Sequence, residues 1–234
     1  MQESSFGRLL GVLVSPSKTF AAIAARPTWV VAMVALVVVG VVVGTLIQDK
    51  IDYEDVIRQS LEQQGRQLGE EETQQAIDIG EKIARVMTVV GPLVFQPLAY
   101  LLLGVIFMVL FKVLGGDLTF VKSLAVIVHG MMPRLVLGLL SIPVILGREE
   151  FSAEELQSGG VMASNAGAFA GEDAGPGIVA LLSSFDIFSL WAMVLLVIGF
   201  AAAARISKGT AAGGVVGLWI VYVLGKIGVA ALRG

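Results

Sequence analysis

The chain has 234 residues, of which 56% are apolar and 15% charged, and its mean hydropathy is +0.86. A soluble domain carries roughly a quarter charged residues, so this composition indicates that lipid surrounds most of the molecule. The net charge of −3 provides no basic field for nucleic acid, and with no cysteine and one histidine the chain has neither a disulfide nor a conventional zinc site.

Residues 1–27 are predicted to form a cytoplasmic region with a short interfacial helix. Ser15 precedes Pro16, a pattern typical of the first turn of a helix. Phe20 and Ile23 then share one apolar face, and the element ends before Pro27. We expect this amphipathic helix to lie in the headgroup plane of the inner leaflet.

Five apolar stretches follow, each long enough to cross roughly 30 Å of hydrocarbon as a helix. No strand-like alternation is present, and only helices or closed barrels satisfy their backbone in lipid. The predicted spans are residues 28–47, 87–111, 121–146, 178–204 and 211–232. The sequence therefore predicts an all-α, polytopic transmembrane helical bundle, with residues 28–234 as one five-span membrane domain.

The distribution of charge predicts a cytoplasmic N-terminus and a C-terminus outside. Lys and Arg are denser in the N-terminal segment and the short turns, whereas almost all Asp and Glu lie in two long loops or at the outer part of the fourth span. The first long loop, residues 48–86, has the apolar spacing of two amphipathic helices, and the second of these runs into the second span. The second long loop, residues 148–177, opens with a capping box at Ser152 and Glu155. We expect a multi-pass protein of the plasma (inner) membrane with helical outer loops.

Three motifs in this sequence resemble the bacterial branch of the Yip family of membrane proteins. They are P-x-x-T-F-x-x-I at residues 16–23, LGGDLTF at residues 114–120 and DIFSLW at residues 186–191, and Pro133 in the third span fits the same pattern. The resemblance covers essentially the whole chain and implies a five-span membrane protein. Eukaryotic members bind Rab-type GTPases through a cytoplasmic region much longer than 27 residues, so the resemblance does not carry that function to this chain.

Three charged residues are expected near the same depth in the membrane. Arg134 lies midway along the third predicted span, and Asp186 and Lys226 lie about 7.5 Å outward of the midplane at 1.5 Å per residue. A charge near the bilayer centre costs roughly 2.5 to 3.5 kcal/mol, so we expect each of these residues to have an oppositely charged partner or a functional role. Asp186 is expected to pair with Arg134 or Lys226, which leaves one positive charge in excess. His129, one turn inward of Arg134, is expected to bond within its own helix rather than to relay protons.

Two interpretations of this polar cluster remain open. It is either a buried ion pair that fixes the register of the helices, or an outward-facing cavity whose excess positive charge binds an anionic headgroup or solute. Two GxxxG patterns, Gly40 with Gly44 and Gly213 with Gly217, predict close helix packing within the monomer or between protomers.

No catalytic motif is present, since the chain has no HExxH, G-x-S-x-G or P-loop sequence. Ser183, Ser184 and Ser189 share the approximate depth of Lys226, but this depends on assumed registers and carries no claim. We expect no enzymatic activity, no cofactor and no bound metal. The preferred hypothesis is a membrane organiser or interaction platform whose partners are lipids and another membrane protein or a second copy. The alternative is a small transporter, or a lipid- or anion-binding protein, with a polar intramembrane cavity.

Overall fold

The computed structural model describes residues 4–63, 65, 68–152, 155–156, 161–170 and 174–233. Within these ranges the chain is helical and shows no strand beyond two isolated bridges, which confirms the all-α prediction. Five segments are long and apolar enough to span a membrane: Val30–Lys50, Glu70–Val113, Phe120–Gly147, Ile187–Ala204 and Lys208–Leu232. Their length and composition identify a multi-pass membrane protein.

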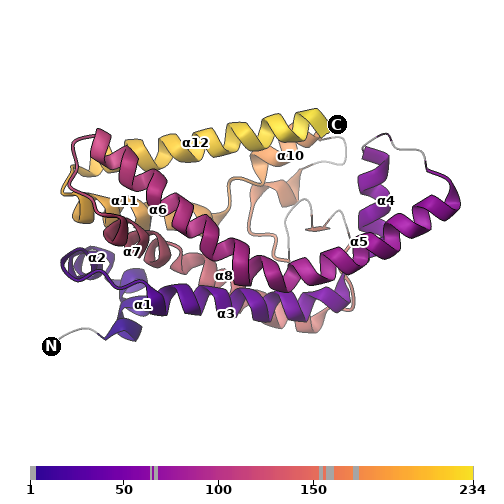
Figure 1. Cartoon of the computed structure of the whole chain (residues 1–234), viewed down its shortest axis with the longest axis horizontal. Helices are drawn as coiled ribbons and strands as arrows, with labels where there is room; N and C mark the ends of the chain where they lie inside the picture. The colour runs from indigo at the N-terminus through magenta and orange to yellow at the C-terminus, as the bar shows by residue number, and fades with distance from the viewer. Residues whose placement is uncertain are drawn as a thin grey trace.

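The helices run in the order shown in Figure 1. They are α1 (Ser5–Val14), α2 (Pro16–Ala25), α3 (Val30–Ile47), η1 (Gln48–Lys50), α4 (Tyr53–Gln63), α5 (Glu70–Val90), η2 (Gly91–Phe95), α6 (Gln96–Val113), α7 (Phe120–Gly130), α8 (Met132–Gly147), η3 (Ala166–Phe169), α10 (Pro176–Leu182), α11 (Ile187–Ala204) and α12 (Lys208–Arg233).

The N-terminal region forms two helices, where the sequence predicted one. α2 starts at Pro16 as predicted, but its apolar face is buried against α7 and α11 inside the bundle, with Phe20 and Ile23 fully covered. The exposed large apolar side chains of this region lie on α1 instead and are Phe6, Leu10 and Val14. The helix that offers an apolar face to a membrane surface is therefore α1.

Arg8 fastens α1 to the start of the first span. Its side chain is buried, and Nη1 donates to the carbonyl oxygen of Arg26 and to Oγ1 of Thr28, each at 2.8 Å. Arg26 also ends α2, so one guanidinium holds α1, the end of α2 and the entry to α3 together.

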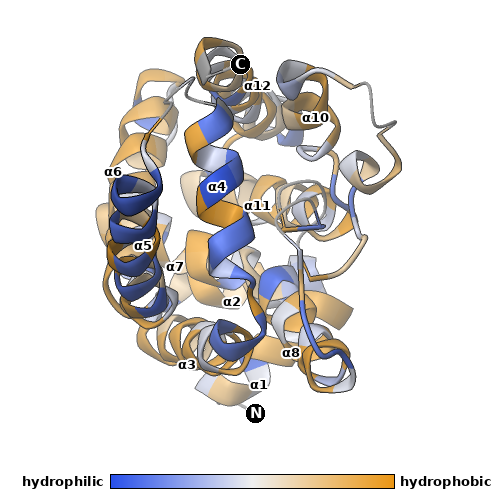
Figure 2. Ribbon diagram, turned by 90° about the vertical axis from the view of Figure 1, so that its right-hand side faces the viewer, coloured by the Kyte–Doolittle hydropathy of each residue, from blue (hydrophilic) through white to orange (hydrophobic). Residues whose placement is uncertain are grey.

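The first long loop folds as the two predicted amphipathic helices, α4 and α5. α5 continues through the π-turn η2 into α6, so this segment runs as one long helix across Figure 1 while the α4–α5 hairpin projects beyond the bundle. Figure 2 shows that α4 and the start of α5 are hydrophilic, unlike the spans behind them. Pro92 causes the π-turn, since it has no N–H to donate to the carbonyl of Thr88.

Two of the predicted spans are interrupted in the structure. The third is α7 followed by α8, with a turn at Met131, because Pro133 cannot donate to the carbonyl oxygen of His129. The predicted fourth span, 178–204, is two helices: α10 ends at Leu182, and α11 starts after Asp186. The 18 residues of α11 measure about 27 Å at 1.5 Å per residue, which is close to the hydrocarbon thickness.

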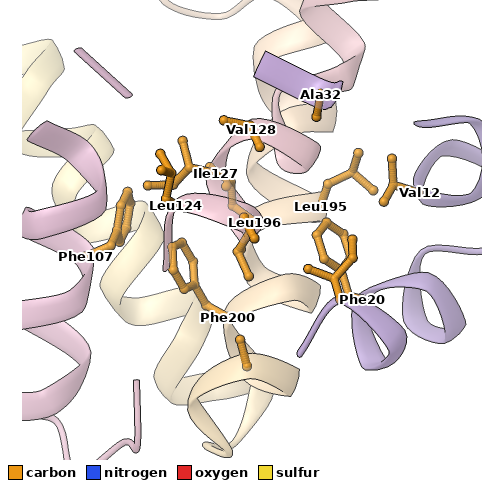
Figure 3. Packing of buried hydrophobic residues seen from close by; sticks show 14 of the residues in the cluster. Val12, Phe20, Ala32, Phe107, Leu124, Ile127, Val128, Leu195, Leu196 and Phe200 are labelled. Carbon is orange, nitrogen blue, oxygen red and sulfur yellow. The ribbon is translucent and has the colours of Figure 1, made fainter. Parts of the chain in front are cut away.

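The main core lies where α2, α6, α7 and α11 meet. Residues 123–130 of α7 are all buried, which makes α7 the central helix of the bundle. Phe107 stacks on Phe200 with ring centroids 4.6 Å apart, and Leu195 and Leu196 of α11 approach Phe20 and α7 from the other side (Figure 3). Such aromatic and aliphatic contacts fix this end of the bundle firmly.

A second, smaller core joins the two long loops. Phe151 is buried with Ile47 and Ile145, and its backbone N–H donates to the carbonyl of Lys50 at 2.7 Å. The capping box predicted for the second loop is present, since Ser152 and Glu155 bond reciprocally at 3.2 Å. The loops are thus packed on each other and on the ends of α3 and α8.

Candidate intramembrane ligand cavity

A cavity of about 420 Å³ lies between α6, α8, α11 and α12. Its polar lining comes from α8, from the turn between α10 and α11, from α11 and from α12. These polar side chains are Arg134, Ser183, Ser184, Ser189 and Lys226. The other lining residues are apolar or aromatic, as in most small-molecule sites, which combine apolar walls with a few polar groups.

Arg134 enters this cavity from the first turn of α8, directly after the interruption that Pro133 produces. Its side chain is exposed. Its guanidinium forms no hydrogen bond or ion pair with any residue that the structure describes. An arginine within a membrane-spanning segment thus has no counter-ion among the residues that the structure describes.

Lys226 reaches the cavity from α12. Its Nζ donates to Oγ of Ser183 at 2.6 Å, and that hydroxyl donates in turn to the carbonyl oxygen of Ala180 at 3.2 Å. Ser184 Oγ donates to the same carbonyl at 2.7 Å. The lysine is therefore tethered to the end of α10, and it also borders a second hollow of about 610 Å³ along α12.

Asp186 does not form the ion pair that the sequence suggested. It is the N-cap of α11: its carboxylate accepts from the backbone N–H of Phe188 at 3.4 Å, and from the N–H and Oγ of Ser189 at 3.0 and 2.9 Å. Within the described part of the chain it has no ion pair with Arg134 or Lys226. The physical reason is the break before α11, because a carboxylate at a helix start is stabilised by unpaired N–H groups and by the helix dipole. The predicted single helix over residues 178–204 placed Asp186 in a helix interior, where no cap is expected.

The lining of the cavity consequently holds two cations and no carboxylate among the described residues. Asp186 does not line the cavity, but its carboxylate accepts a hydrogen bond from Oγ of Ser189, which does. The sequence predicted one carboxylate between two bases, whereas the described lining holds the two bases alone, and Arg134 has no partner among the described residues.

His129 lies apart from this cluster and does not line the cavity. It is buried in α7, and its Nδ1 lies 2.8 Å from the carbonyl oxygen of Ala125, which can only accept, so the ring donates. This bond stays within its own helix and offers no relay to Arg134.

The two GxxxG pairs lie in different surroundings. A Cβ on Gly40 would lie 2.8 Å from Cβ of Pro92, and a Cβ on Gly44 would lie 2.1 Å from the carbonyl oxygen of Thr88, so this pair packs closely on η2 and α5. Gly213 and Gly217 on α12 have nothing within 4 Å. The first pair joins helices within the monomer, whereas the second leaves an open face.

Two aromatic residues that line the cavity were not predicted from the sequence. Trp219 and Tyr222 line it together with Lys226. These three residues recur at spacings of three and four along α12 and so share one helix face. That spacing was the available signal, but in a helix that is apolar on most sides it did not indicate which face met the other helices.

Comparison with known proteins identifies the family. The Yip1 domain matches residues 10–229, which include every residue that lines the cavity. Membrane protein YknW of Bacillus subtilis (strain 168) is 30% identical over 208 residues, which cover 86% of this chain and 80% of YknW. No solved structure matches the chain significantly. The chain therefore belongs to the Yip1-domain family of membrane proteins.

Proposed function

We propose that this protein is a non-enzymatic membrane protein that binds the anionic headgroup of a lipid, with Arg134 as the principal counter-ion. One observation carries the proposal: Arg134 lines a cavity of the membrane-spanning region, and its guanidinium has no partner among the described residues. Leaving such a charge unpaired near the bilayer centre costs roughly 2.5 to 3.5 kcal/mol. An oxyanion removes that cost, because it accepts paired hydrogen bonds from the planar fork of an arginine.

Lys226 supports the same function from a different helix, α12. Its ammonium uses one donor on Ser183 and retains two for a ligand. With Asp186 engaged in capping α11, the described lining offers an anion two cations and no competing carboxylate.

The geometry of Ser183 and Lys226 favours binding over catalysis. A nucleophilic serine needs a base that takes its proton, whereas the Ser183 hydroxyl donates to a backbone carbonyl and receives a bond from the lysine. The backbone N–H groups of Ser183, Ser184 and Phe185 are all bonded to carbonyls of the preceding turn, so they do not form an oxyanion hole.

A role as an interaction platform is the second candidate, and the open face of Gly213 and Gly217 favours it. A helix of a second copy or of another membrane protein could approach α12 closely there, because no atom of another described helix lies within 4 Å of either Cβ position. Lipid binding and partner binding use different surfaces and are compatible. We further propose the inner membrane, with a cytoplasmic N-terminus, as the location.

Native mass spectrometry in lipid-retaining particles tests the lipid-binding function. The wild type, extracted from its own membranes, is expected to carry an anionic lipid that Arg134→Gln loses. Lys208→Gln removes the same charge at the exposed start of α12 and is expected to retain the lipid. A wild type without anionic lipid, or a folded Arg134→Gln variant with equal occupancy, would overturn the proposal. A stoichiometric partner protein lost on Gly217→Leu would support the platform instead.

A further inference from the structure

The cavity has a polar end and an apolar end. Lys226 and Ser183 lie toward the C-terminal end of α12, whereas Phe107, Leu196 and Val215 form the other end, next to the aromatic core. The eleven helical steps from Val215 to Lys226 correspond to about 16 Å of helix. A ligand that follows this polarity has a charged head at one end and hydrocarbon at the other.

The cavity reaches the lipid-facing surface between α6 and α12. These helices meet at one end, where Gly214 packs on the ring of Phe111, and they separate toward the other end (Figure 1). Ile106 of α6 and Tyr222 of α12 line the cavity and are also exposed. A membrane lipid can therefore enter from the side without passing through water.

The volume limits how much of a lipid fits inside. About 420 Å³ is near the lower end of the roughly 300 to 1,000 Å³ typical of small-molecule pockets. The second hollow shares Val221, Tyr222 and Lys226 with the cavity and continues along α12 through Gly225 and Val229, away from Val215. None of Phe107, Leu196 and Val215 lines it, so it does not enlarge the apolar end.

We infer that the ligand is a single-chain lipid with a phosphate head, held with the phosphate between Arg134 and Lys226 and the chain directed toward Phe107 and Val215. A tetrahedral phosphate accepts hydrogen bonds from an arginine and a lysine at once, which suits two cations on different helices. This inference rests on the proposed function and adds the number of chains, the head chemistry and the direction of entry.

The test uses the purified full-length chain in particles of zwitterionic lipid, with native mass spectrometry as the readout. The probes are lysophosphatidylglycerol, lysophosphatidylcholine, two-chain phosphatidylglycerol and inorganic phosphate. We expect lysophosphatidylglycerol to bind at least about tenfold more tightly than the other three, a ratio that Arg134→Gln reduces. Shortening its chain from tetradecanoyl to hexanoyl should weaken binding stepwise in the wild type.

A matched pair of variants tests the position of the chain. Ile106→Trp fills the apolar end from α6, and Val105→Trp places the same bulk on the neighbouring, exposed position outside the cavity. We expect Ile106→Trp alone to weaken lysophosphatidylglycerol binding about tenfold. If Ile106→Trp fails to fold, the chain-length series in the wild type decides the same point.

The outcomes separate this inference from the proposed function. Equal binding of phosphatidylglycerol, or of inorganic phosphate, in an Arg134-dependent manner would overturn the single-chain ligand while leaving anion binding intact. Equal binding of lysophosphatidylcholine would overturn the role of the head charge. If none of the anionic probes binds, the inference and the proposed function both fail.

Discussion

Replacing Gly44 by alanine should separate α3 from α5. The new Cβ would lie 2.1 Å from the carbonyl oxygen of Thr88 and 3.0 Å from its carbonyl carbon, so the obstacle is backbone that no side-chain rotation can move. Pro92 leaves this carbonyl without its helical donor, and a hydrogen of Gly44 points at it in a weak C–H···O contact.

The magnitude follows from two opposing effects. Overpacking costs about 1 to 3 kcal/mol, and the rigid backbone contact at Gly44 puts this site near the upper limit. The higher helix propensity of alanine offsets this cost by at most ~1 kcal/mol. The expected net loss is about 2 kcal/mol in the free energy of unfolding, or roughly 4 to 8 °C in Tm for a chain of this size.

Thermal unfolding in one fixed detergent measures the effect, with Gly213→Ala as the matched control. Gly213 belongs to the other GxxxG pair and has nothing within 4 Å, so its alanine variant should match or slightly exceed the wild type in Tm. A Gly44→Ala variant as stable as the wild type would refute the packing argument. Equal destabilisation by Gly213→Ala would refute it too, since that result would place the open face in a contact.

Two further predictions concern the cap and the outer loops. Asp186→Ala should lower the free energy of unfolding by about 1 kcal/mol, whereas Asp186→Asn should change it little, because asparagine also caps a helix; equal losses in thermal unfolding would favour a charge pair instead. The Arg148 hydrogen bond holds the pKa of Glu155 below its usual range, so this pair stabilises the fold above the ordinary glutamate pKa and loses that contribution as the pH falls through the lowered value. Arg148→Gln should raise the Glu155 pKa in a carboxyl NMR titration, and an unchanged titration would show that the contact does not persist in solution.

Part of the candidate site could be predicted from the sequence. Arg134 and Lys226 stand out because charges are rare in apolar spans, and the positions of the spans give their approximate depths. Depth alone does not say which side chains meet, because this also depends on how each helix is rotated about its axis. Asp186 was expected to pair with Arg134 or Lys226. Its carboxylate instead accepts hydrogen bonds from N–H groups of α11, because the chain breaks its helix just before α11. Hydropathy does not reveal that break.

The sequence by itself determined the class of protein, the five apolar segments and the amphipathic helices of the first long loop, because each depends on how a local stretch of chain interacts with lipid or water. Tertiary structure alone decided that α2 turns its apolar face into the bundle, that Gly44 is packed while Gly213 is open, and that Arg134 lines a cavity with no counter-ion in the described part of the chain. These outcomes depend on contacts between segments far apart in the chain. In a bundle whose helices are apolar on nearly every side, periodicity does not identify the face that meets a neighbour.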